Sequence, residues 1–138
     1  MTAPKSRARP IARFRLRVVA GDAILVGPGK IALLEAIRDT RSITAAAKAL
    51  GMSYRRAWML VDEVNRALRG AAVASAIGGE RGGGSELTPL GAELVALYRR
   101  IEATAERACA RDLARLLALA TPTRARASGA RRRSRSTP

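Results

Sequence analysis

Two short helical patterns that meet at Gly51, in the segment "AAAKALGMSYRRAW" (residues 45–58), constrain the fold more than any other feature. The alanines before the turn allow the two helices to approach closely. Gly51 predicts the left-handed residue that ends the first helix, and Ser53 predicts the N-cap of the second. A helix pair joined by so tight a turn indicates a helix-turn-helix.

The flanking patterns extend this unit on both sides. Alternation from Arg13, with Phe14, Leu16 and Val18 on one face, predicts a strand, and residues 20–22 and 23–26 predict a turn and a second strand. A helix ending near Arg41 precedes the pair, and Ser42 predicts the cap of the next helix. After it, strands at 71–77 and 86–88 flank the loop "GGERGGGS" (residues 78–85). The order predicts a mainly α fold with small β hairpins, a winged helix-turn-helix.

A long last helix is predicted from 88 to 119, because Thr88 supplies a cap and Pro89 suits the first helical position. Its apolar residues follow heptad spacing, with Thr104 at the skipped position. We favour dimerisation over packing within one subunit, because a long helix beside a small domain rarely buries its whole stripe alone. The predicted dimerisation residues, called the seam below, are Leu90, Leu94, Leu97, Ile101 and Ala108.

Charge divides the chain into a domain and two ends. The formal net charge is +15, yet residues 1–17 and 124–138 each carry six basic side chains and no acidic one. We expect a disordered basic arm at 1–12, one domain at 13–120 and a disordered Arg-rich tail at 121–138. Charge alone suits nucleic acid, anionic lipid or solubility. No apolar run is long enough for a membrane span, so we expect no membrane partner. A single cysteine cannot form an internal disulfide, and we expect a cytoplasmic location.

The sequence offers little for catalysis. It has one cysteine, Cys109, and no histidine, which excludes histidine-based triads and histidine or multi-cysteine zinc sites. "GPGKIA" (residues 27–32) matches a dinucleotide-binding pattern, but the following segment predicts an Ala-rich helix where a second parallel strand is needed. A nucleotide-binding enzyme is therefore a minor alternative. We expect no enzymatic activity, no catalytic residues, no cofactor and no metal.

The start of the second helix predicts contact with double-stranded DNA. The first residues of this helix enter the major groove in helix-turn-helix proteins, and arginine pairs with guanine O6 and N7. A solvated charged face is the alternative. Trp58, spaced with Val61, is predicted to be core. The predicted DNA-binding residues are Thr44, Lys48, Ser53, Tyr54, Arg55, Arg56 and, in the wing loop, Arg81.

"GPGKIALLEAIRDTRSITAAAKALGMSYRRAWMLVDEVN" followed by "GGERGGGSELTPLG" resembles the N-terminal DNA-binding domain of the molybdate-responsive transcriptional regulators (ModE), over about residues 13–110. The resemblance implies a dimeric, LysR-like winged helix that recognises DNA with the helix starting at Ser53 and with a wing around Arg81. Full-length members carry C-terminal molybdate-binding modules, whereas this chain ends in an arginine-rich tail. We therefore expect a sequence-specific regulator without an effector domain of its own. Three alternatives stay open: it acts constitutively, it is controlled by a separate effector-binding partner protein, or it regulates something unrelated to molybdenum. A protein-interaction winged-helix module and a non-specific nucleoid or RNA-binding protein are the alternatives.

Overall fold

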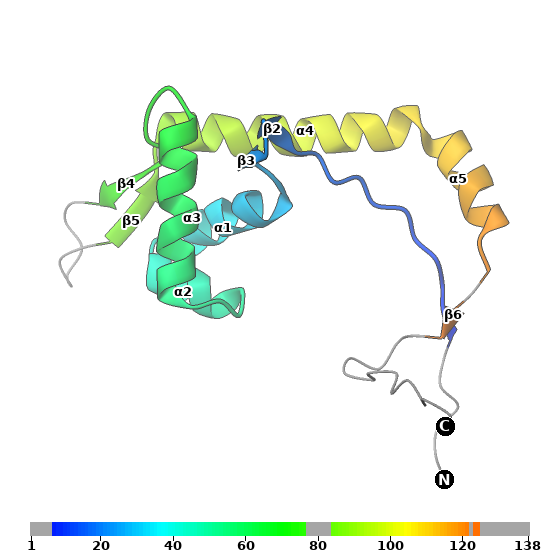
Figure 1. Cartoon of the computed structure of the whole chain (residues 1–138), viewed down its shortest axis with the longest axis horizontal. Coiled ribbons are helices and arrows are strands. Elements are labelled where there is room, and N and C mark those ends of the chain that lie inside the picture. Colours follow the sequence, from blue (N-terminus) through cyan, green and yellow to red (C-terminus); the bar gives the residue numbers. More distant parts are fainter. Residues whose placement is uncertain (1–6, 77–83, 122, 125–138) are drawn as a thin grey trace, which may run out of the picture. The chain divides into compact units, whose positions relative to one another are not determined.

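The computed structural model describes residues 7–76, 84–121 and 123–124, which fall into two units (Figure 1). Phe14–Ala108 form the larger unit, and the residues before and after it form the smaller one. The elements are β1 (Arg7–Ala8), β2 (Val18–Ala20), β3 (Ala23–Val26), α1 (Pro28–Thr40), α2 (Ile43–Ala49), α3 (Tyr54–Ala67), β4 (Val73–Ala76), β5 (Gly84–Leu87), α4 (Pro89–Ala108), α5 (Ala110–Leu119) and β6 (Thr123–Arg124). This arrangement confirms an α+β winged helix.

The core of the larger unit lies among α1, α2, α3 and α4, with further buried residues from β3 and β4. Side chains of α1 supply its largest fully buried members, among them Ile31, Leu34 and Ile37. Arg41 ends α1 in the left-handed conformation with φ 58°, and the Ser42 hydroxyl accepts a hydrogen bond from the Ala45 amide at 3.1 Å. The predicted cap of α2 is confirmed, and it fixes the direction in which α2 leaves α1.

The first hairpin, β2–β3, is shorter than the alternating pattern predicts. Pairing begins at Val18 rather than Arg13, and Gly21 makes the turn with φ 58°. Phe14 and Val18, expected on an inner face, are exposed, whereas Leu16 packs against the core and Val26 is buried. The alternation is typical of a sheet face that another layer covers. Among the described residues no element covers this two-stranded ribbon, which therefore buries few of its side chains.

The wing is the antiparallel hairpin β4–β5, in which Val73 pairs with Leu87 and Ala76 with Gly84. Two contacts attach it to the end of α1. The Ser85 amide donates to the Arg41 carbonyl at 3.0 Å, and the Arg41 guanidinium lies 3.0 Å from the Glu86 carboxylate. The wing therefore starts from a fixed position beside the helical core.

α4 begins where the sequence predicts. The Thr88 hydroxyl accepts from the Gly91 amide at 3.1 Å and donates to the Ala71 carbonyl at 2.6 Å, so one side chain caps α4 and holds the start of the wing. Farther along, the buried Tyr98 hydroxyl donates to the Leu16 carbonyl at 2.8 Å. Burial raises the pKa of Tyr98 above its ordinary value.

Arg99 connects α4 to α1 by an ion pair with Glu35, and it also pairs with Glu102 at 2.7 Å. The hydrogen bonds that Arg99 donates to Glu35 and then to Glu102 raise the pKa of Arg99, so the guanidinium stays charged throughout the ordinary pH range. These contacts fix α4 against the core along its first three turns.

The long helix predicted from 88 to 119 is interrupted at Cys109. There the backbone has φ −101° and ψ 8°, so α4 stops at Ala108 and α5 begins at Ala110. The buried residues of α4 end at Tyr98, and α5 contains none. No glycine or proline marks the break in the sequence.

Both chain ends were expected to be disordered. Among the described residues of these ends, Arg7–Ala8 pair antiparallel with Thr123–Arg124, and the disorder of the ends stays a prediction. A two-residue ladder needs only backbone amides and carbonyls, so it leaves no side-chain pattern in the sequence. Residues 1–6 and 125–138 of the expected arm and tail lie outside the described residues.

Candidate nucleic-acid interface

The turn between α2 and α3 has the geometry that the sequence predicts. Gly51 has φ 66°, a left-handed conformation that glycine adopts without strain, and the Met52 amide donates to the Ala47 carbonyl at 3.0 Å. The Ser53 hydroxyl accepts from the Arg56 amide at 3.1 Å. Ala47 and Ala57 are buried at the contact between the helices. A rigid, small-residue contact thus presents the first turn of α3.

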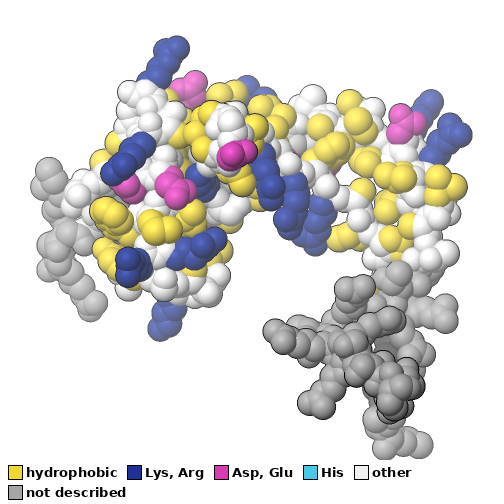
Figure 2. Space-filling view, viewed as in Figure 1, with side chains coloured by type: hydrophobic (Ala, Val, Ile, Leu, Met, Phe, Trp, Pro, Cys, Tyr) yellow, Lys and Arg dark blue, Asp and Glu magenta, His cyan; other side chains and the backbone are white. Residues whose placement is uncertain are grey.

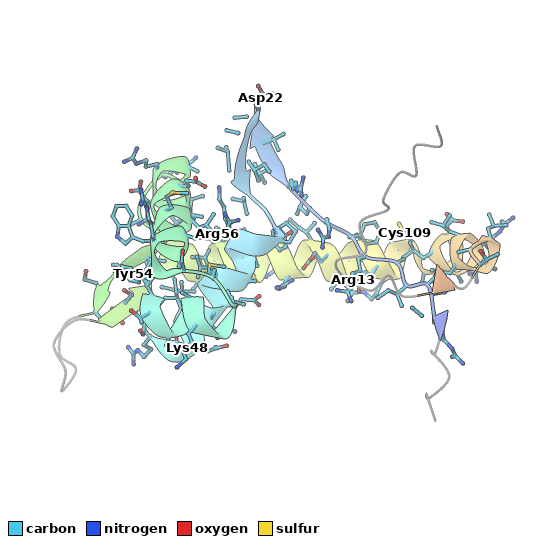
Figure 3. All side chains as sticks on the ribbon, turned by 60° about the horizontal axis from the view of Figure 1, so that its bottom comes forward. Arg13, Asp22, Lys48, Tyr54, Arg56 and Cys109 are labelled. Carbon is cyan, nitrogen blue, oxygen red and sulfur yellow. The ribbon has the colours of Figure 1, made fainter. Side chains whose placement is uncertain are left out.

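The predicted DNA-binding residues that the structure describes are all on the surface. Tyr54 is 55% exposed, and both neighbouring arginines are exposed with it. Lys48 and Tyr54 lie on the two helices at either side of the turn (Figure 3). The exposed set is Thr44, Lys48, Ser53, Tyr54, Arg55 and Arg56. Arg81 lies outside the described residues.

The first residues of α3 point in different directions around the helix axis. Successive helical residues are rotated by about 100°, so Arg55 falls opposite the buried stripe of Ala57, Val61 and Val64. Arg56 lies on the side of the β2–β3 hairpin, whose tip is at Asp22 (Figure 3). Tyr54 falls on the other side of the helix, that of the wing. The surface therefore has a central arginine with a different neighbour on each flank.

Arg56 borders an open pocket of about 400 Å³ between α3, the β2–β3 hairpin and the start of α1. Arg17 lines the same pocket, as does Lys30. Lys30 is only 8% exposed, donates to the Ile24 carbonyl and lies 3.1 Å from the Glu63 carboxylate. The lysine of "GPGKIA" therefore joins α1, β3 and α3. In the described chain α1 leads directly to α2, and the second parallel strand that a dinucleotide-binding unit needs does not follow α1.

Trp58 was predicted to be core, and this prediction is wrong. Its side chain is 52% exposed, whereas Ala57 and Val64 carry the buried stripe. The spacing of three between Trp58 and Val61 recurs between Val61 and Val64. Periodicity alone therefore does not decide whether the buried stripe of α3 includes Trp58 or Ala57. The close approach of the alanines of α2 selects the stripe of smaller residues.

Asn65, which is not among the predicted residues, supports this surface from its partly buried position on α3. Its side-chain oxygen accepts from the Ala72 and Val73 amides at 2.8 and 3.2 Å, and its side-chain nitrogen donates to the Val73 carbonyl at 3.3 Å. The amide thereby fixes the start of the wing against α3. Asn65 is seven residues after Trp58, so the two lie on one side of α3. This spacing is the feature of the sequence that could have indicated Asn65.

Basic and hydrophobic side chains are interspersed over the side of the molecule that carries α2 and α3 (Figure 2). Among the described residues, no group of histidine, cysteine or acidic side chains is arranged to hold a metal ion. In the same part of the chain, no helix is long and apolar enough to cross a membrane.

A capped helix with an exposed polar first turn, held beside an antiparallel hairpin, defines a winged helix-turn-helix protein. No family model matches the chain. It is 47% identical over 78 residues to the molybdenum-pterin-binding protein MopB of Rhodobacter capsulatus, covering 56% of this chain and 29% of that protein. It is 39% identical over 94 residues to the molybdenum transport protein ModE of Azotobacter vinelandii, covering 68% and 34%.

A third relative is the DNA-binding transcriptional dual regulator ModE of Escherichia coli, 39% identical over 75 residues that cover 54% of this chain and 29% of that protein. The resemblance predicted from the sequence is confirmed: over half of its length or more, this chain is homologous to proteins named ModE and MopB. It spans about a third of the length of these relatives.

Proposed function

We propose that this chain is a sequence-specific, double-stranded-DNA-binding transcriptional regulator that acts as a homodimer. The observation that carries the proposal is the exposed first turn of α3, in which Tyr54, Arg55 and Arg56 surround a helix start capped by Ser53. The homology to proteins named as transcriptional regulators supports it. Such a regulator would act at the nucleoid, in the bacterial cytoplasm.

The residues divide between two kinds of DNA contact. Tyr54, Arg55 and Arg56 would enter the major groove, where arginine recognises guanine through two hydrogen bonds. Thr44 and Lys48 on α2 and Ser53 at the start of α3 would contact phosphates and fix the position of the protein on the duplex. Arg81 in the wing loop would reach a phosphate or the minor groove.

The seam on α4 supports dimerisation. Leu97 and Ile101 are 43% and 51% exposed, and Ala108 is exposed too, while Leu90 and Leu94 are partly buried within the larger unit. The buried face of α4 uses Gly91, Val95 and Tyr98, so the seam runs beside it and its far end is uncovered. A second copy that covers this end would supply the second recognition helix, about 34 Å from the first for two half-sites.

Selection of bound fragments from the genome of the source organism, followed by footprinting, tests this function. We expect enrichment of a few fragments with a protected segment of defined length, and genes of molybdenum transport are the first candidates because of the names of the relatives. The matched control is a chain with Tyr54, Arg55 and Arg56 all changed to Ala. These side chains are exposed, so the variant should fold and lose the enrichment.

Two outcomes would contradict the proposal. Binding without preference over competitor DNA, with no footprint of defined length, would indicate a nucleoid or RNA-coating protein. Absence of DNA binding by a folded chain would indicate a protein-interaction module.

A further inference from the structure

Trp58 and Tyr54 form an exposed aromatic pair on α3. Trp58 is 52% and Tyr54 55% exposed, and they stand one helical turn apart. The whole chain has only four Phe, Trp and Tyr residues, so half of its aromatic side chains are on this short surface. Trp58 is also the sole tryptophan. Large aromatic side chains are costly to leave in water, and their exposure in a defined patch indicates a binding surface.

The pair lies on the wing side of α3. Tyr54, Trp58 and Asn65 fall within about 40° of one another around the helix axis, and Asn65 is hydrogen bonded to the first residue of β4. Arg55 points about 100° away from Tyr54, toward the outermost face. The aromatic pair is therefore lateral: it lies between the face that would meet base edges and the hairpin beside it.

The dimensions of the groove decide what a lateral side chain would meet. The major groove is about 12 Å wide, and an α-helix with its side chains is about 10–12 Å across. A helix seated in the groove therefore fills it. Side chains on the outermost face then meet base edges, whereas side chains on the flanks meet the sugar–phosphate walls.

We propose that Tyr54 and Trp58 pack against the sugar–phosphate backbone of the strand that forms the wing-side wall of the groove. The deoxyribose would contact the faces of the rings, and the indole N–H of Trp58 would donate to a phosphate oxygen. This inference rests on the proposed DNA-binding function and adds to it a contact that fixes the position of the protein without reading sequence. It assigns Trp58 to the DNA interface. It also changes the role of Tyr54, proposed above to enter the major groove, to contact with the sugar–phosphate wall of that groove.

Because the chain has one tryptophan, its fluorescence reports on Trp58 directly. The full chain is titrated with a dye-labelled duplex carrying the selected operator and with a random duplex, and both dye anisotropy and tryptophan emission are recorded. We expect a blue shift and a change of intensity that follow the anisotropy on both duplexes. In the matched control, Trp58→Phe/Val19→Trp, the indole moves to the exposed Val19 of β2, and the emission should not follow binding.

Substitution separates this contact from base recognition. Trp58→Ala should weaken binding about tenfold on the operator and on random DNA alike. The slope of affinity against salt should be unchanged, because no charge is lost. Trp58→Phe keeps the apolar contact and loses the N–H, so its loss should be smaller. Thermal unfolding of each variant, with Val19→Ala as the matched truncation of another exposed apolar residue, shows whether the fold is intact.

Each other result overturns the inference. Unchanged tryptophan emission while anisotropy rises would leave the proposed function standing and remove Trp58 from the interface. A loss confined to the operator would make Trp58 a base-reading residue. An emission shift with protein concentration alone would show that a second copy covers the pair. Absence of any anisotropy change on either duplex would refute the proposed function, and this inference with it.

Discussion

Arg55 has the most central position of the exposed residues at the start of α3, opposite the buried stripe. Arg55→Ala should therefore cost about 1–3 kcal/mol of binding free energy at the operator and much less on random DNA, because a two-pronged contact with guanine is lost. Competition binding with both duplexes measures the difference. Equal losses on the two duplexes would contradict a role for Arg55 in sequence recognition.

Arg56 provides the comparison for Arg55, since it has the same charge one position away. It lies toward the β2–β3 hairpin, where it borders the pocket with Arg17 and Lys30. Arg56→Ala should lower operator affinity with less loss of site preference than Arg55→Ala. Both variants lose one positive charge, so a difference between them reports the position of the side chain on α3 and not its charge.

Gly91 allows the first turn of α4 to approach the start of the wing. A Cβ at this position would lie 2.2 Å from the Ala72 carbonyl oxygen, which is backbone and has little freedom to move. We predict that Gly91→Ala lowers the free energy of unfolding by about 2–3 kcal/mol. Chemical denaturation measures it. In Gly29→Ala, where an added Cβ meets nothing within 4 Å, stability should be unchanged or slightly higher.

At the level of elements, the N-cap of α3 affects both the stability of the fold and the affinity for DNA. Ser53→Ala should cost about 1 kcal/mol of unfolding free energy, because the Arg56 amide loses its acceptor. Ser53→Asp restores the cap and places a negative charge near the positive end of the helix, so stability should be retained. The same carboxylate would face the DNA phosphates, and operator affinity should fall at least about tenfold.

Thermal unfolding and operator binding, measured on both Ser53 variants, distinguish these effects. Retained stability with unchanged affinity in Ser53→Asp would show that the first turn of α3 does not approach DNA. Parallel loss of both properties would show that the substitution damages the fold instead.

The elements that the sequence predicts correctly depend on neighbouring residues alone. The capping and turn roles of Ser42, Gly51, Ser53 and Thr88 involve backbone groups no more than a few residues away, so these roles follow from residue type and position. Such local chemistry is the same in any fold, which is why the helix starts and the turn could be predicted.

The elements that the sequence does not predict depend on contacts between distant segments. Trp58 is exposed because α2 approaches a different stripe of α3. The β2–β3 ribbon keeps an exposed face because no element of the described part of the chain covers it. The interruption at Cys109 occurs where α4 no longer packs against the core. Periodicity in one segment does not report which face another segment will cover.

For the whole molecule, the seam on α4 predicts the oligomeric state. Ile101 is half exposed at the uncovered end of the seam, and a carboxylate there would be buried without a partner in a dimer. Ile101→Glu should therefore yield a folded monomer by sedimentation equilibrium, with weaker operator binding. Ala96→Glu puts the same charge on an exposed position outside the seam and should remain dimeric. A dimeric Ile101→Glu chain would exclude the seam as the interface.

The basic ends of the chain predict a separate, sequence-independent contribution to binding. Six arginines lie in residues 124–138 without an acidic residue, and the first of them, Arg124, is in β6. Each phosphate that such a residue neutralises adds about 0.9 to the slope of log affinity against log salt. Deletion of 124–138 should therefore flatten this slope and slow association, and site preference should be unchanged.

A control of equal length, in which the six arginines are changed to Gln, separates charge from chain length and should behave like the deletion. Titrations at several salt concentrations give the slope, and repeated selection on genomic fragments gives the preferred sequence. A changed preferred sequence would show that this segment contacts bases. Such a result would move part of the recognition from α3 to the end of the chain.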